Sequence, residues 1–183
     1  MAPSPGGALV MTYLLLHKCL SREVNTLPGD FHQAYAEFIQ AIELRDVYAS
    51  YVNAKTLLDV KEIEVAKKLP LRAVPTYDVD HSQIESGELI GRVHISLVAY
   101  VQLHGRRRTA LTYKATWNVR YTLKPAGVDM FRSSDESVRG SIIAAFSQFN
   151  LPVNVWPYIR AQIHAMTQDF GVTPIRLGVL RRV

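Results

Sequence analysis

Residues 89–123, LIGRVHISLVAYVQLHGRRRTALTYKATWNVRYTL, decide the fold, because two long runs within them alternate between apolar and polar side chains. Every second residue from Leu89 to Leu103 is apolar or glycine, and the same holds from Leu111 to Leu123. A period of two is typical of a strand with one buried face. The two runs meet at HGRRRT (104–109), so the sequence predicts an antiparallel hairpin whose strands far exceed the usual length of about five or six residues.

The segments before this hairpin extend the predicted sheet. Residues 71–79, LRAVPTYDV, also alternate with a period of two, and Pro75 favours an edge position because it has no N–H to donate. The polar residues 80–88, DHSQIESGE, indicate a turn. Residues 44–70 are ambiguous, and they fit either one long strand with a crossover or two short strands.

Three helices are predicted around the sheet. The first spans residues 31–44, with Asp30 as its N-cap and one aromatic-rich face: Phe31, Tyr35, Phe38, Ile39 and Ile42. After a loop at 124–132, Ser133 and Glu136 have the spacing of a capping box for a second helix. A third helix begins at Asn154, so Pro157 falls in its first turn, and it ends at Gly171. The sequence therefore predicts an α+β fold.

Composition excludes several classes of protein. Apolar residues make up 48% of the chain and the mean hydropathy is +0.02, yet no stretch reaches the ~18 to 20 apolar residues of a membrane span. Cys19 is the only cysteine, which excludes an internal disulfide and favours the cytoplasm. Residues 1–30 lack the pattern of a secretion signal and are predicted to form a flexible N-terminal arm.

No pattern of catalytic or metal-binding residues is evident. Glycine-rich phosphate loops, HExxH, GxSxG and paired-cysteine spacings are all missing from the sequence. The sequence is interpreted as a solvated turn at Asp78, Asp80 and His81. Glu62 and Glu64 are interpreted as part of the solvent-exposed face of a strand. We therefore expect no enzyme activity, no metal and no cofactor.

The C-terminal half resembles a known family. Trp156, Pro157, Tyr158 and Arg160 open a helix, and Pro174 and Leu177 follow in a short tail. This arrangement is similar to the SecB family of protein-export chaperones. The resemblance implies one SecB-like domain over residues 31–183, with a long four-stranded antiparallel sheet and helices packed on one face. It also implies an ATP-independent holdase that assembles as a homodimer or homotetramer.

The resemblance further implies a client-binding groove. Its residues would come from the crossover after the first strand and from the long helix: Leu57, Leu58, Val60, Ile63, Val65, Trp156 and Ile163. Clients would be unfolded polypeptides, either export preproteins or an antitoxin. Export members of the family are acidic whereas this chain has a net charge of +5 and a pI near 9.4, so the choice between these clients stays open. In the assembly, the strand near residues 45–56 is expected to pair at an edge and the helix at 134–149 to pack between dimers.

Two other functions are considered. A nucleic-acid-binding module would use the basic turn GRRRT (105–109) with Tyr113 and Trp117, but both aromatics lie on the apolar phase of their strand. A small-ligand-binding module would use a pocket under the sheet. Trp156 either contacts clients or is a core residue that packs the helix on the sheet. We expect the structural role, because tryptophan usually buries most of its surface.

Overall fold

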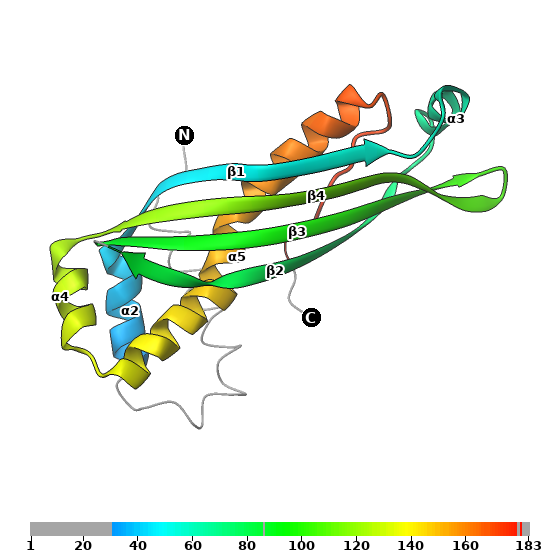
Figure 1. Ribbon diagram of the computed structural model, residues 1–183. Helices are drawn as coiled ribbons and strands as arrows, with labels where there is room; N and C mark the ends of the chain where they lie inside the picture. The colour runs from blue at the N-terminus through cyan, green and yellow to red at the C-terminus, as the bar shows by residue number, and fades with distance from the viewer. Residues whose placement is uncertain (1–30, 86, 179, 181–183) are drawn as a thin grey trace, which may run out of the picture.

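The computed structural model describes residues 31–85, 87–178 and 180 of the chain. The predicted N-terminal arm and its Cys19, together with the N-cap Asp30, lie outside these residues. Within these described residues, four helices and four strands follow one another in the order shown in Figure 1: α2 (Phe31–Ala41), β1 (Ile42–Thr56), α3 (Val60–Ala66), β2 (Arg72–Glu85), β3 (Glu88–Leu103), β4 (Arg106–Leu123), α4 (Pro125–Ser133) and α5 (Glu136–Asp169).

The predicted hairpin is the centre of one antiparallel sheet with the strand order β1-β4-β3-β2. Leu97 pairs with Tyr113 in the middle of the hairpin. Its turn is made by His104 and Gly105, which both have positive φ (50° and 76°), as a two-residue hairpin turn with the right twist requires. Strand β2 lies at an edge, as Pro75 predicted, and β1 forms the other edge.

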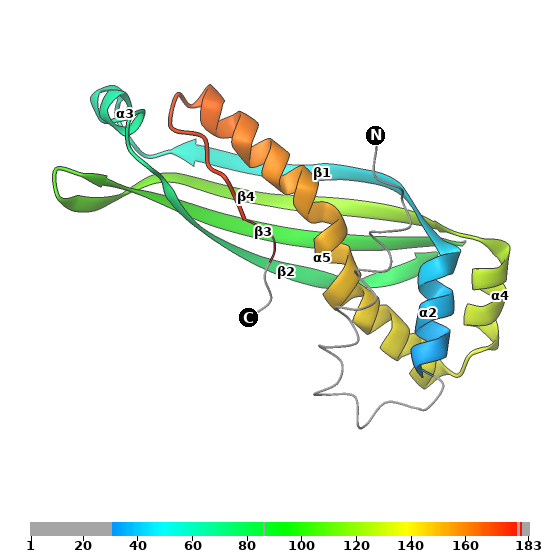
Figure 2. The same ribbon diagram turned by 180° about the vertical axis from the view of Figure 1, so that it is seen from behind.

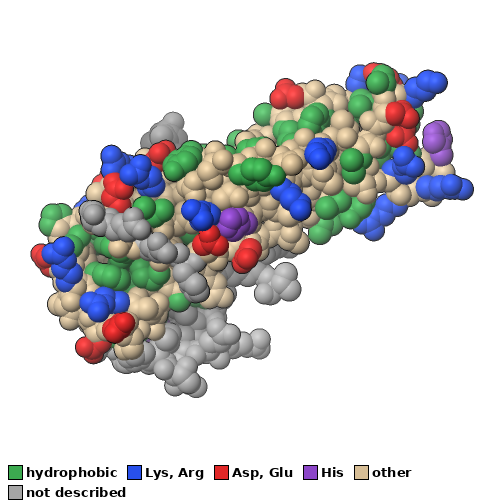
Figure 3. Space-filling model, in the orientation of Figure 1, with side chains coloured by type: hydrophobic (Ala, Val, Ile, Leu, Met, Phe, Trp, Pro, Cys, Tyr) green, Lys and Arg blue, Asp and Glu red, His purple; other side chains and the backbone are tan. Residues whose placement is uncertain are grey.

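The two faces of the sheet differ as the alternation predicted. Alternate residues of β3 and β4 are buried on the inner face, which α5 crosses diagonally (Figure 2). The outer face carries polar and charged side chains of both signs (Figure 3). The α+β class, with a long four-stranded sheet and the long helix on one face, is thus confirmed.

The prediction of two C-terminal helices is wrong, because α5 runs unbroken through 34 residues and contains both Pro152 and Pro157. A proline inside a helix removes one backbone hydrogen bond and costs about 3 kcal/mol. The apolar side chains around these prolines compensate, since Leu151, Val155 and Trp156 are buried in the core. Asp135 is the N-cap of α5, so Ser133 and Glu136 do not form the predicted capping box.

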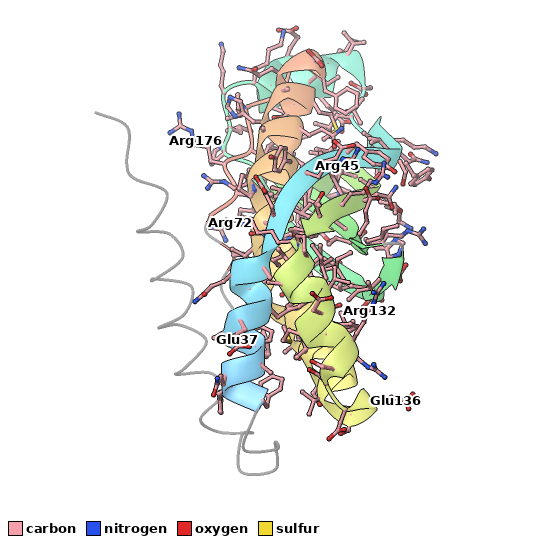
Figure 4. The ribbon with its side chains drawn as sticks, turned by 90° about the vertical axis from the view of Figure 1, so that its left-hand side faces the viewer. Glu37, Arg45, Arg72, Arg132, Glu136 and Arg176 are labelled. Atoms are coloured by element: carbon pink, nitrogen blue, oxygen red, sulfur yellow. The ribbon has the colours of Figure 1, made fainter. Side chains whose placement is uncertain are left out.

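The loop predicted at 124–132 is also wrong, because residues 125–133 form α4. Pro125 is tolerated in the first turn of this helix, where its missing N–H has no intrahelical acceptor. Gly127 permits a close approach to α2: a Cβ atom there would lie 2.4 Å from the Cβ of Ala41. Helices α2 and α4 pack side by side at one end of the molecule, nearest the viewer in Figure 4, where Arg132 and Glu136 are labelled.

Three further boundaries differ from the prediction. Helix α2 ends at Ala41, and Ile42 begins β1 and pairs with Leu123, so the helix does not reach residue 44. Strand β2 continues to Glu85 through the predicted turn, with an irregularity between Asp80 and Gln83. The crossover contains the short helix α3, so Glu62 and Glu64 lie on a helix and not on a strand.

Candidate functional site

The inner face of β1 carries apolar side chains that the described helices leave open. Helix α5 packs mainly on β2 and β3. Along β1, Leu44 and Val52 remain 41% and 44% exposed although their register partners on β4 belong to the buried face. We call the residues on this face the open strip: Leu44, Val47, Ala49, Val52 and Ala54.

One side of α5 runs beside the open strip. Asn154 and Gln162 hydrogen-bond the hydroxyl groups of Tyr121 and Tyr113 on β4, the first at 2.9 Å, and the ring of Tyr158 lies 6.4 Å from that of Trp117. In the sheet register, Tyr121, Trp117 and Tyr113 are the neighbours of Leu44, Ala49 and Ala54. The open strip therefore lies next to a row of aromatic rings that α5 holds in place.

Helix α3 stands beyond the C-terminal end of the open strip. Its capping box joins Asp59 and Glu62, and Glu62 also pairs with Arg108 of the hairpin at 3.2 Å. Sequence reading missed this helix, although the spacing of Asp59 and Glu62 is a helix-start signal. Three side chains of the crossover are exposed, with Val60 the most open at 77%: Leu57, Val60 and Val65. Ile63 is half-buried, and Leu58 is buried in the core.

The two site residues predicted on the long helix are core residues. Trp156 is only 7% exposed, and its Nε1 donates a hydrogen bond to the carbonyl oxygen of Gly178 at 2.9 Å. Ile163 is fully buried. In contrast, Pro157, Tyr158 and Arg160 of the family motif are exposed. The structure therefore brings Leu57, Val60 and Val65 to the surface, and it places Leu58, Trp156 and Ile163 inside.

Charged groups on the outer face pair with one another. Asp80 lies 3.3 Å from Arg92 and 3.2 Å from His94. Glu88 binds Arg120 at 2.7 Å and also Arg45, and the hydrogen bond from Arg120 is the main cause that lowers the pKa of Glu88. Within the described residues, no three His, Cys, Asp or Glu side chains are placed to hold a metal ion.

The aromatic residues considered for nucleic-acid binding are not available at the surface. Tyr113 and Trp117 are buried, and burial raises the pKa of Tyr113. A hollow of about 460 Å³ does lie under the sheet between β2 and the C-terminal tail, and Trp156, Tyr77 and Leu177 are among its lining residues. None of the helices in the described part of the chain has the length and apolarity that crossing a membrane requires.

The structure resembles a solved SecB-like chaperone from Mycobacterium tuberculosis, which was determined in complex with a ChAD peptide from the HigA1 antitoxin. The match has a TM-score of 0.63 at 14% sequence identity and covers 82% of this chain and 99% of that one. The chain has a SecB-like fold. The predicted SecB-like architecture is thereby confirmed.

Other comparisons add little to the SecB-like assignment. A protein of unknown function from Streptococcus agalactiae covers 75% of this chain at 8% identity, but its TM-score of 0.31 is too low to support an argument. No family model and no curated protein match the sequence.

Sequence reading missed the residues of the open strip. Two irregularities in the pairing of β1 with β4, at Arg45 and Ser50, break the alternation of apolar residues along β1. Leu44, Val47, Ala49, Val52 and Ala54 therefore do not follow one period of two. Tyr158, whose ring lies near that of Trp117 beside the open strip, was recognisable from the sequence because it belongs to the family motif.

Proposed function

We propose that this protein is an ATP-independent chaperone, a holdase, which binds extended apolar segments of unfolded polypeptides on the open strip and the adjoining crossover. The observation that carries the proposal is the exposure of Leu44 and Val52 on the inner face of the sheet, the face that otherwise forms the core. Apolar surface that stays in water is costly, and contiguous patches of this kind commonly mark sites for partners.

The position of the open strip suits an extended client. The strip runs along β1 from Leu44 to Ala54, so an extended segment can lie along it and bury its own apolar side chains there. The aromatic rings held by α5 and the exposed Leu57 and Val60 extend the apolar contact at either side. Binding through apolar area needs no nucleotide and tolerates many client sequences.

The solved SecB-like chaperone supports a peptide as the client, because it was determined with an antitoxin peptide. We therefore include an antitoxin beside export preproteins among the client classes. We further propose that the protein catalyses no reaction, uses no cofactor and works in the cytoplasm as a homodimer or homotetramer.

An aggregation assay tests the proposal. The full-length protein should suppress the aggregation of a chemically denatured model client in the absence of ATP. Val52→Asp should lose most of this suppression, because a carboxylate on the open strip opposes the burial of apolar client side chains.

Tyr48→Asp is the matched control. Tyr48 lies on the same strand with the same 44% exposure, but on the outer face of the sheet. The Tyr48→Asp variant should suppress aggregation as the parent protein does. Failure of the parent at a several-fold molar excess, or equal loss in the two variants, would contradict the proposal.

A further inference from the structure

The net charge of the protein is concentrated at the end of the sheet that carries the β3–β4 turn. Residues 55–72 and 100–110 contain eight Lys or Arg and three Asp or Glu, a net charge of +5. The whole chain contains 21 and 16, which is also +5, so the remaining residues are neutral in sum. These two segments meet in space. The backbone N–H of Leu57 donates a hydrogen bond to the carbonyl oxygen of Ala110 at 2.9 Å, and Arg108 forms an ion pair with Glu62. Figure 3 shows Lys and Arg side chains gathered at this end.

A hollow of about 360 Å³ opens within this cationic end. Arg72 on β2 is the register partner of Tyr100 on β3, and Arg107 reaches the Tyr100 ring from β4, the strand on the other side of β3. The guanidinium carbon of Arg107 lies 3.6 Å from the centroid of Tyr100. Leu69, Pro70 and Val74 supply an apolar wall.

The two arginines of this hollow are available to a partner. Neither Arg72 nor Arg107 forms an ion pair with a carboxylate of the described residues, whereas the neighbouring Arg108 is paired with Glu62. The stacking of Arg107 on Tyr100 holds one guanidinium group in a fixed position, so less side-chain entropy is lost when an anion binds.

We propose that this hollow, the Arg72–Tyr100–Arg107 site, binds an acidic segment of a partner polypeptide. A carboxylate of that segment would sit between the two guanidinium groups, and an adjacent aliphatic side chain would contact Leu69, Pro70 and Val74. Carboxylates are the side-chain anions that arginine forks bind best. Net positive charge confined to one end of the molecule would also steer such a segment toward the site.

The observations favour an acidic polypeptide over nucleic acid. Arg107 covers one face of the Tyr100 ring, which a stacked base would otherwise use. The wall of Leu69, Pro70 and Val74 is aliphatic and suits a branched side chain better than a sugar-phosphate backbone. The site lies on the outer face of the sheet, so it is separate from the open strip and does not depend on the chaperone proposal.

Fluorescence anisotropy with the full-length protein tests the site. The probe is a labelled peptide of alternating Glu and Leu, and the comparison peptide has Gln in place of every Glu. We expect the Glu peptide to bind about 10-fold more tightly at low salt, the effect of about one charge-assisted hydrogen bond, and the difference to shrink as salt is added.

Three variants locate the binding. Arg72→Gln and Arg107→Gln should each reduce this preference for Glu by several fold. Arg132→Gln removes the same charge from α4 at the opposite end and should leave the preference unchanged. Val52→Asp should also retain it, because the open strip lies on the other face.

Three results would overturn the inference. These are equal affinity for the Glu and Gln peptides, an equal effect of Arg107→Gln and Arg132→Gln, and tighter binding of a single-stranded oligonucleotide of the same length. The aggregation assay is read separately, so a failure of the acidic site is distinguishable from a failure of the chaperone proposal.

Discussion

The indole Nε1 of Trp156 donates a hydrogen bond to the carbonyl oxygen of Gly178 at 2.9 Å, and this bond ties the middle of α5 to the C-terminal tail. The tail residues Ile175 and Leu177 are buried in the same core. Trp156 therefore has the surroundings of a structural core residue, because its ring is packed and its polar atom is hydrogen-bonded.

Replacing Trp156 should mainly affect stability. Trp156→Ala leaves a large cavity, and we expect a loss of about 3 to 5 kcal/mol in the free energy of unfolding. Trp156→Phe keeps much of the packing but not the hydrogen bond, so it should lose about 1 to 2 kcal/mol. Urea denaturation measures both. A Trp156→Ala variant that unfolds like the parent but binds clients poorly would show that the side chain is a client contact.

The contact of α4 with α2 predicts opposite effects for two glycine substitutions. A Cβ atom at Gly127 would lie 2.4 Å from the Cβ of Ala41, and this atom belongs to a packed helix and cannot rotate away. Gly127→Ala should destabilise the protein by about 1 to 3 kcal/mol.

Gly140 on α5 is the matched control. A Cβ atom there meets no other atom within 4 Å, so Gly140→Ala should stabilise the helix by about 0.5 to 1 kcal/mol. Thermal unfolding checks both variants: the melting temperature should fall for Gly127→Ala and rise for Gly140→Ala. Equal melting temperatures would mean that α2 and α4 do not pack as described.

Much of the sheet was predictable, because period-two alternation in β3 and β4 follows directly from one buried face. The continuity of helix α5 was not predictable, because Pro152 and Pro157 both favour a break. Only the burial of Leu151, Val155 and Trp156 explains why the helix continues through them. The local propensity of a residue is a weak guide when tertiary packing opposes it.

The candidate site was predictable only in part. The resemblance pointed to the crossover, and three of its five apolar residues are exposed: Leu57, Val60 and Val65. The open strip depends on which strand α5 leaves uncovered, and this is a property of how α5 crosses the sheet. No pattern in residues 42–56 carries that information.

The ion pair of Glu88 with Arg120 predicts how stability depends on pH. Because the folded pKa of Glu88 is lowered, the stabilisation is present above the ordinary value of 4.5 and is lost as the pH falls through the lowered value. Glu88→Gln should therefore lose less stability than the parent on acidification below pH 4.5. Arg120→Gln should behave similarly, because it removes the main cause of the lowered pKa. Urea midpoints measured between neutral and acidic pH test this, and identical pH profiles for parent and variants would contradict it.

The free edge of β1 predicts self-association. Its neighbour on one side is β4, and its other side has no strand partner within the described chain. The opposite edge, β2, is a poorer template, because Pro75 lacks an N–H and β2 is irregular between Asp80 and Gln83. We therefore expect a homodimer at least, with β1 strands of two copies paired, and the helix at 134–149 stays the predicted contact between dimers. Light scattering should give a mass above 20.6 kDa, and the amides of β1 should exchange more slowly as concentration rises while those of β2 do not change. A mass near 20.6 kDa at micromolar concentration would contradict the dimer, and the open strip of one protomer would then have to hold a client alone.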